Sequence, residues 1–561
     1  MKNMKKAIIV LASVSLMMTG CGQGEANKET NVDSTTVAAE NEASIEGVKI
    51  ELSDEAILVD GEAISTESEE AVYMAKDIVY YEEGKDFTYG EGTEEDAHSA
   101  AEAAAHTVVH ITQPGTYELT GSLSAGQIAV DLGEDAESDP NAVVTLILNN
   151  ADIHCSVAPA VIFYNVYECG TTDEETATKD IDTSAAGANV IIADGSTNNI
   201  YGSYVARIYE SVELNDAGTE VVDGKKLHKY DAAFYSKMSM NIEGGKEGTG
   251  ILNITAENEG LDTELHLTIN GGNINIESGN DGINTNEDYV SVTTVNGGTL
   301  KIKVTGSTGE GDGIDSNGWL VINGGTVIAE ACGFSADAGI DSDMGIYING
   351  GTVIASGNML DFISGSTQNY AVMNFAQSQK AGDTYTLRDS DDQVVLEYSP
   401  ENDFSYLIYS SADLKEGTYT FWKGDTQLQA EAGEGMNGGF GGPRGMMPGG
   451  AMPEDMEFPE GMEMPEGMEF QEGMEFPEGM ERPEGMERPE GMERPEGMEW
   501  PENMEMPEGM EFPEDMEFPQ GGQMPGGMGR PNGTGQTSGE VSAEFNIASG
   551  SNYFTGVSVV E

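Results

Sequence analysis

The feature that most constrains the fold of this chain is a repeat of 26 or 27 residues between positions 241 and 361. Each unit carries a Gly-Gly pair, and the residues that precede these pairs are Glu243, Asn270, Asn296, Asn323 and Asn349. A fixed period of this length indicates a repeat architecture in which each unit stacks on the previous one. The alternative is an antiparallel sandwich, which does not explain a steady period.

The residues around each Gly-Gly pair predict a corner followed by a strand. Asn-Gly-Gly supplies the positive φ that a sharp corner needs. Apolar side chains then occupy alternate positions, namely Ile274/Ile276, Leu300/Ile302, Val327/Ala329 and Val353/Ala355. The position directly after the glycines is polar, and it is occupied by Asn273, Thr299, Thr326 and Thr352. We therefore predict an all-β chain in which residues 46–361 form a right-handed parallel β-helix, a solenoid with one apolar interior.

The N-terminus has the pattern of an export signal. Lys2, Lys5 and Lys6 precede a short apolar run, and small residues lead to Cys21. This pattern predicts a lipoprotein signal peptide over residues 1–20, with Cys21 as the lipidated first residue of the mature protein; the alternative is an ordinary secretory signal. Residues 21–45 are polar and predict a flexible tether.

The C-terminal third changes character twice. Residues 362–435 lose the period and predict a small β-cap over the end of the solenoid. Residues 436–539 are dominated by Pro-Glu-Gly-Met-Glu hexads, and a proline in every hexad prevents a regular helix, so we predict a disordered insertion. Residues 540–561 return to a strand pattern and predict a terminal strand that docks on the cap. Three further cysteines, Cys155, Cys169 and Cys332, are an odd number, which favours buried free thiols over a disulfide framework.

The charge of the chain excludes one class of partner. It has 100 acidic and 25 basic Lys and Arg residues, a formal net charge of −75. Nucleic-acid binding needs a basic surface, so nucleic acid is not an expected partner. An acidic surface suits divalent cations instead.

Acidic residues recur beside glycines in the turns of the repeat. Equivalent residues of successive coils stack roughly 4.8 Å apart, so two carboxylates one coil apart can hold a calcium ion between them. Residues 241–361 contain 18 acidic residues and three Lys, too few cations to neutralise the stack. The alternative is that Asp and Asn simply favour solvated turns. We expect calcium as the cofactor, with ligands among Glu259, Asp262, Asp281, Asp312, Asp315, Asp337, Asp341 and Asp343.

Several motifs in order carry a family resemblance over roughly residues 106–361. They are "ITQPGTYELTGSLSAGQIAVDL", "VVTLILNNADI", "DGSTNNI", "DAAFYSKMSMNIEGG" and the Gly-Ile-Asp and Asn-Gly-Gly units. The chain resembles the bacterial carbohydrate-binding β-helix lipoproteins of plant-fibre-degrading anaerobes, whose fold is similar to that of pectate lyases. The resemblance implies calcium and the binding of cellulose or pectic polysaccharide. The chain departs from the family pattern at Met238 and Ser239, where acidic residues are expected, which puts a cation site there in doubt.

Candidate sugar contacts are few in the repeat region. Trp319 follows the Asp312 turn and can present its ring to a sugar or pack on the next coil. Tyr289 is a weaker aromatic candidate, and Lys301 is the one tempting base for a lyase reaction. A lone surface lysine is more often a solvated charge, so we expect no catalysis. We predict a monomeric, extracellular, lipid-anchored protein that binds plant cell-wall polysaccharide and meets the membrane only through its anchor. A calcium-dependent polysaccharide lyase and a structural surface adhesin remain the alternatives.

Overall fold

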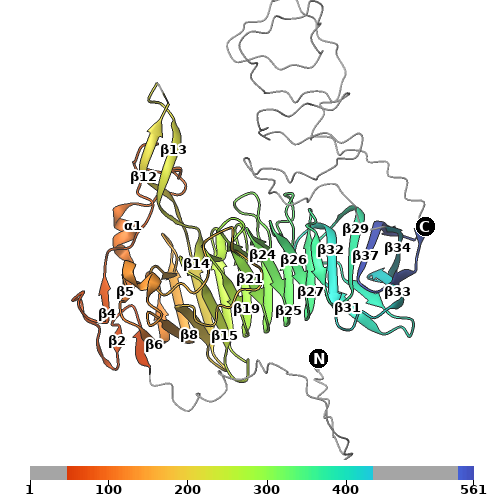
Figure 1. The fold of residues 1–561 in the computed structure, drawn as a ribbon, viewed down its shortest axis with the longest axis horizontal. Helices are drawn as coiled ribbons and strands as arrows, with labels where there is room; N and C mark the ends of the chain where they lie inside the picture. Colours follow the sequence, from red (N-terminus) through yellow and green to blue (C-terminus); the bar gives the residue numbers. More distant parts are fainter. Residues whose placement is uncertain (1–46, 216, 434–540, 561) are drawn as a thin grey trace, which may run out of the picture. The chain divides into compact units, whose positions relative to one another are not determined.

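The computed structural model describes residues 47–215, 217–433 and 541–560, which are almost entirely strands and turns (Figure 1). Within these ranges the helical elements are α1 (Ala100–Ala105) and the 3-10 helix η1 (Glu134–Ser138). The prediction of an all-β chain is therefore confirmed. The predicted signal peptide, Cys21, the tether and the low-complexity insertion lie outside the described residues. Nowhere in the described ranges is a helix both long and apolar enough to cross a membrane.

One sheet of eight strands runs through about the first two-thirds of the described chain. Its neighbouring strands pair in parallel, except for the antiparallel pair of β4 and β5. In spatial order the strands are β4 (Val72–Ala75), β5 (Thr107–Ile111), β7 (Gly126–Val130), β9 (Val161–Phe163), β14 (Ala232–Ser236), β17 (Glu259–Thr263), β20 (Ile283–Thr285) and β23 (Ile314–Ser316).

A second, 27-stranded sheet contains two further successions of parallel strands. The first succession is β1 (Val48–Leu52), β6 (Gly115–Leu123), β8 (Val144–Cys155), β10 (Ala188–Ile192), β15 (Met240–Gly244), β18 (Leu267–Ile269), β21 (Val292–Val295), β24 (Trp319–Ile322), β26 (Gly345–Ile348) and β28 (Ile363–Ser366). The second begins in the later half of β8 and continues through β11 (Thr197–Gly202), β16 (Ile251–Ala256), β19 (Asn273–Ser278), β22 (Thr299–Val304), β25 (Thr326–Glu330) and β27 (Thr352–Gly357).

The repeat in the sequence corresponds to the register of these strands. Ile274 of β19 pairs with Leu300 of β22, which pairs with Val327 of β25, which pairs with Val353 of β27. All four side chains are at most 1% exposed. The polar file at the preceding position, Asn273, Thr299, Thr326 and Thr352, is in the same register. Equivalent residues of successive units are therefore neighbours, as the period indicates.

The Asn-Gly-Gly corners connect the two successions of the large sheet. The second glycine of each pair has φ between 77° and 95°, at Gly272, Gly298, Gly325 and Gly351. The corner asparagines form a ladder, because each side-chain amide donates to the corner side chain of the preceding unit. These hydrogen bonds measure 2.7–2.9 Å and join Asn270 to Glu243, Asn296 to Asn270, Asn323 to Asn296 and Asn349 to Asn323. The ladder satisfies polar groups that a bare stack of corners would leave unpaired.

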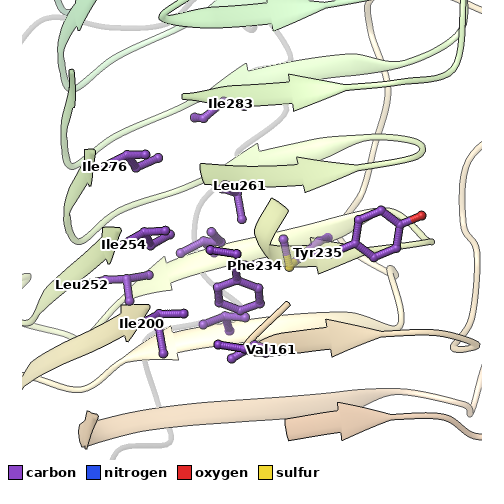
Figure 2. Packing of buried hydrophobic residues seen from close by; sticks show 14 of the residues in the cluster. Val161, Ile200, Phe234, Tyr235, Leu252, Ile254, Leu261, Ile276 and Ile283 are labelled. Carbon is purple, nitrogen blue, oxygen red and sulfur yellow. The ribbon is translucent and has the colours of Figure 1, made fainter. Parts of the chain in front are cut away.

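The core lies between the eight-stranded sheet and the large sheet (Figure 2). Figure 2 shows side chains of both sheets gathered there, among them Val161, Phe234, Leu261 and Ile283 from the small sheet and Ile200, Leu252, Ile254 and Ile276 from the large one. Tyr235, the neighbour of Phe234 on β14, points the other way, to the outer side of the eight-stranded sheet. Cys155, Cys169 and Cys332 are free thiols, and the first and last are buried.

Residues 370–433 and 541–560 form a second apolar cluster built from strands that pair antiparallel, except for the parallel pair of β29 and β37. β27 pairs antiparallel with β32, and the terminal strand β37 lies between β29 and β34. The strands are β29 (Tyr370–Gln379), β30 (Tyr385–Arg388), β31 (Val394–Tyr398), β32 (Phe404–Ser411), β33 (Gly417–Lys423), β34 (Thr426–Gly433), β35 (Val541–Ser542), β36 (Phe545–Ile547) and β37 (Ser551–Val559).

The remaining strands lie at the N-terminal end and in a hairpin. β2 (Leu58–Val59) and β3 (Glu62–Ala63) pair antiparallel next to β1. The antiparallel hairpin of β12 (Val205–Leu214) and β13 (Val221–Tyr230) makes a sheet of its own and projects beyond the other strands (Figure 1).

Candidate cation sites

The acidic turns stack because glycines allow their backbones to touch. The amides of Gly260, Gly282 and Gly313 donate to the carbonyls of Asp281, Asp312 and Ala338 in the next unit, each at 3.0 Å. A Cβ atom on any of these glycines would lie within 2.6 Å of a carbonyl oxygen of the next turn. The turns can therefore approach each other this closely only if these positions are glycine. The close approach brings the carboxylates of neighbouring units together.

One cluster of three carboxylates is buried where β14 and β17 begin, and we call it the buried cluster. It consists of Asp231, Glu259 and Asp262, each offering an oxygen within 4.8 Å of the others. Asp231 and Glu259 are 5% exposed, and Asp262 is completely buried. Lys229 forms an ion pair with Asp231, with 2.6 Å between Nζ and Oδ2.

Two oxygens of the buried cluster have no hydrogen-bond partner. The amide of Asn284 donates to Glu259 Oε1 at 3.2 Å, and the amide of Asn286 donates to Asp262 Oδ1 at 2.8 Å. The second oxygen of each carboxylate, Glu259 Oε2 and Asp262 Oδ2, is buried and unpaired. Burial raises the pKa of both carboxyls well above their ordinary values, and the neighbouring carboxylates raise it further. A buried acceptor without a donor is costly, so this geometry fits a cation between the oxygens.

A second cluster, the outer cluster, lies at β23 and in the segment between β25 and β26. Asp312, Asp315 and Asp341 offer oxygens within 4.8 Å of one another and are half-buried. Asp281 of the preceding unit lies beside them, because the backbone amide of Asp312 donates to Asp281 Oδ1 at 2.7 Å. The amide of Ala338 donates in turn to Asp312 Oδ1. Backbone bonds thus hold the carboxylates of three successive units in one file.

The electrostatics of the outer cluster differ from those of the buried cluster. Burial, with the surrounding carboxylates, raises the pKa of Asp315 to about 8 and that of Asp281 to about 7. The pKa of Asp312 is also raised well above its ordinary value, first by burial and then by Asp281. The groups that act on these three carboxyls are other carboxylates and backbone amides, with no lysine comparable to Lys229. The outer cluster therefore concentrates negative charge that hard cations such as calcium prefer.

Residues 105–391 match the family model described as "carbohydrate-binding domain-containing protein". The chain belongs to this family. Both carboxylate clusters lie inside the matched region.

Two individual proteins are similar to the chain. A "carbohydrate-binding domain-containing protein" of Acetivibrio thermocellus is 29% identical over 172 residues, which cover 30% of this chain and 45% of that protein. The chain thus spans about half the length of this relative. A solved structure, described as the polysaccharide lyase-like protein from C. thermocellum in a gadolinium derivative, covers 57% of this chain and 93% of its own, with 20% identity and a TM-score of 0.31.

Within the matched region, the structure separates the eight predicted cation ligands into groups. Five of them lie in the two clusters, and Asp281 lies next to the outer one. Asp337 Oδ2 accepts from the amide of Gly311 at 2.8 Å, which joins two turns of the stack. Asp343 follows the outer cluster, and its amide donates to the carbonyl of Ser316 at 3.0 Å.

The three predicted sugar contacts lie away from the clusters' own strands. Lys301 is on β22 of the large sheet and forms an ion pair with Glu401. Trp319 begins β24 of the same sheet and is half-buried. Tyr289 lies between β20 and β21 with φ of 60°, and its amide donates to the carbonyl of Asn317 at 2.7 Å.

Sequence reasoning missed two carboxylates and one lysine. Asp231 precedes the repeat as it was defined, although it begins the family motif "DAAFYSKMSM". Asp361 ends the repeat, and burial together with Asp341 raises its pKa to about 7. Lys229 precedes Asp231 by two residues and gave no signal of its own. The chain departs from the family pattern at Ser239, whose amide and hydroxyl donate to Glu168 at 2.7 and 2.8 Å. Ser239 therefore supplies hydrogen-bond donors where the family pattern has a carboxylate.

Proposed function

We propose that residues 47–361 are a parallel β-helix that holds calcium ions on its acidic turns. Three successions of parallel strands, one in the small sheet and two in the large sheet, support the solenoid, because each strand pairs with its counterpart one unit away. The asparagine ladder at the corners has the same period.

The donor sets of the two clusters support calcium as the cation. Each cluster offers three carboxylates from adjoining turns, and calcium binds six to eight oxygens, with carboxylates and carbonyls preferred. The unpaired oxygens of Glu259 and Asp262 are the observation that carries the proposal, because nothing else in the buried cluster satisfies them. Magnesium requires a tight octahedral shell and dehydrates reluctantly, so it fits such turns less well.

The function that follows is binding of plant cell-wall polysaccharide at the cell surface, without catalysis. Calcium on the outer cluster gives an acidic protein a way to bind an acidic polymer such as polygalacturonate, because the cation bridges carboxylates of both partners. The family description supports carbohydrate as the ligand class. The ion pair of Lys301 with Glu401 supports a binding role, because it occupies the one lysine considered as a lyase base. Lipidation at Cys21 would hold the domain at the membrane.

Binding of the full chain to polygalacturonate, with and without calcium, tests this function. We expect binding in millimolar calcium, its loss in EGTA, and its return when calcium but not magnesium is added back. The double variant Asp312→Asn/Asp315→Asn should lose calcium-dependent binding. Glu277→Gln is the matched control, because Glu277 is an exposed carboxylate on β19 that pairs with Lys303.

Three outcomes would contradict the proposal. Binding that is the same in EGTA and in calcium would exclude the cation as a bridge. A full chain that binds no glycan of a plant cell-wall panel in calcium would exclude the function itself and leave the adhesin alternative. Unsaturated uronide products in the same reactions would show that the protein is a lyase.

A further inference from the structure

A cleft of about 1070 Å³ lies on the outer side of the eight-stranded sheet and borders the buried cluster, because Lys229 lines the cleft and pairs with Asp231. Its floor comes from β5, β7 and β14, where Val108, Gln127 and Tyr235 line it. Lys226–Tyr230 of the β13 strand line one side, and Glu134–Ser138, the residues of η1, contribute three lining residues. Pockets that hold small organic ligands measure about 300–1,000 Å³, so this cleft has room for a short oligosaccharide rather than an ion.

Three tyrosines of the cleft are in contact with one another. The ring centroids of Tyr164 and Tyr230 are 5.5 Å apart, and those of Tyr230 and Tyr235 are 5.1 Å apart, both in edge-to-face geometry. The hydroxyl of Tyr235 donates to Glu264 Oε1 at 2.6 Å. Tyr230 is hydrogen-bonded through its hydroxyl to His228 Nδ1, also at 2.6 Å. These bonds fix rings that combine an apolar body with a polar tip.

Two of the three lysines that line the cleft form ion pairs with carboxylates of the cleft. Lys226 Nζ donates to Glu264 at 2.9 Å, and Lys237 Nζ donates to Glu137 at 2.6 Å. The amide of Asn165 donates to Asp131 at 2.8 Å. None of the carboxylates of the two cation clusters lines the cleft. The cleft therefore presents polar groups held in hydrogen bonds beside aromatic rings, and not a concentrated charge.

This lining selects the chemistry of the ligand. Seven acidic residues line the cleft against three lysines, a balance that repels phosphate, sulfate or uronate groups. No cluster of carboxylates among the described residues of the cleft offers a cation site to reverse that balance. A neutral sugar fits this lining, since its C–H faces can pack on the half-buried rings of Tyr164 and Tyr167, and its hydroxyls can donate to the carboxylates and accept from the lysines.

We propose that this cleft is a binding site for a neutral oligosaccharide or for one chain of a neutral polysaccharide, separate from the calcium sites. The inference rests on the proposed carbohydrate-binding function and names a second surface for it, with a different ligand class. The outer cluster takes acidic polymer through calcium, and the cleft takes uncharged sugar without it.

Calorimetric titration of the full chain with cellohexaose, xylohexaose and mannohexaose in EGTA tests the inference. We expect one of these neutral probes to bind without calcium. Ser138→Trp places a large ring at the exposed side of the cleft without touching the core, and Tyr230→Ala removes the central ring. Each should weaken binding at least tenfold. Ser122→Trp is the matched control, because Ser122 is exposed on β6 of the large sheet.

The outcomes separate this inference from the proposed function. Loss of binding in Ser138→Trp, with an unchanged melting temperature and an unaffected Ser122→Trp, supports the cleft even where Tyr230→Ala fails to fold. Unchanged affinity in a folded Ser138→Trp would overturn it, because the sugar would then sit elsewhere. Binding of polygalacturonate in calcium, together with no binding of any neutral probe, would also overturn it and leave the proposed function intact. Failure of both kinds of probe would contradict both.

Discussion

The outer side of the eight-stranded sheet carries aromatic and aliphatic side chains on its earlier strands and acidic side chains on its later strands. Tyr235 of β14 and Asp262 of β17 are direct register partners, yet Tyr235 belongs to the aromatic cleft and Asp262 to the buried cluster. On one side of this pair the file continues through Ile162 and Ala129. On the other side it continues through residues 284 and 315, an amide and a carboxylate.

The difference shows that the parallel register determines which side chains are neighbours, whereas the residue types determine what kind of site these neighbours form. The same pairing that stacks aliphatic and aromatic groups at β7, β9 and β14 stacks Asp262, Asn284 and Asp315 at β17, β20 and β23. Lys229 marks the boundary, because it lines the cleft and also pairs with Asp231 of the buried cluster.

The largest effect should be stabilisation of the acidic end by calcium. A ligand at about 1,000 times its Kd stabilises the folded state by about 4 kcal/mol, so two sites together add about 8 kcal/mol. Denaturant unfolding of the full chain in EGTA and in calcium measures this difference. Glu259→Gln/Asp262→Asn and Asp312→Asn/Asp315→Asn should each remove about half of it, whereas Ser138→Trp in the cleft should remove none. An equal calcium effect in all variants would contradict the assignment of calcium to the two carboxylate clusters.

The pH dependence of the metal-free protein should also come from the acidic end. The folded pKa values of Asp281, about 7, and Asp315, about 8, lie above the unfolded value of an aspartate. The folded state therefore keeps protons that the unfolded state has released above about pH 4. The stability is fully present below that pH and is lost as the pH rises through 7 and 8.

Between pH 5 and 8 the two groups together should lower the free energy of unfolding by about 6 kcal/mol, since the loss is about two pKa units for Asp281 and nearly three for Asp315, at about 1.4 kcal/mol per unit. Denaturant titrations in EGTA at several pH values measure it. Asp281→Asn/Asp315→Asn should flatten the curve over this window, and saturating calcium should reverse the loss in the parent chain. A parent curve that rises from pH 5 to pH 8 in EGTA, with the variant following it, would contradict the raised pKa values.

Removal of the boundary lysine should affect only the buried cluster. Lys229→Met leaves Asp231 buried without its cation, and breaking a fully buried pair costs about 3–5 kcal/mol. The Lys229 side chain is 41% exposed, so we expect about 2 kcal/mol in EGTA at pH 8. Calcium should restore most of the loss, because it supplies the missing positive charge. Lys226→Met, which breaks the pair with Glu264 in the cleft, is the matched control and should show no rescue by calcium.

The acidic end was predictable from the sequence, and the cleft was not, for a physical reason. The Asn-Gly-Gly corners repeat every 26 or 27 residues and an acidic turn lies between successive corners, so Asp262, Asp312, Asp315 and Asp341 could be assigned to one file of stacked turns. The all-β character followed from the same period. Asp231 and Asp361 sit at the two ends of the repeat, where the counting stops.

The cleft depends on contacts between segments that share no pattern. Glu137 and Lys237 are 100 residues apart and meet only because η1 and the segment after β14 flank the same floor. Tyr230 and Tyr235 are close in the chain, but their facing rings require the hairpin to return at Tyr230 before β14 begins. Trp319 and Lys301 were predicted sugar contacts, and both are rare residue types in the repeat. The rarity of a residue type does not indicate on which sheet its side chain lies.

Substitution of Lys301 should have the smallest effect on stability and binding, because Lys301 lies on the large sheet and not on the eight-stranded sheet. The ammonium group of Lys301 pairs with Glu401, and both side chains are more than 40% exposed. Exposed ion pairs contribute at most about 1 kcal/mol, and often much less. Lys301→Ala should therefore change the unfolding free energy by about 0.5 kcal/mol or less and leave the affinities for polygalacturonate and for neutral oligosaccharide unchanged. Parallel titrations of both ligands measure this. A tenfold loss for either ligand would place part of the glycan surface on the large sheet, because Lys301 has no contact with the cleft or the clusters through which such a loss could act.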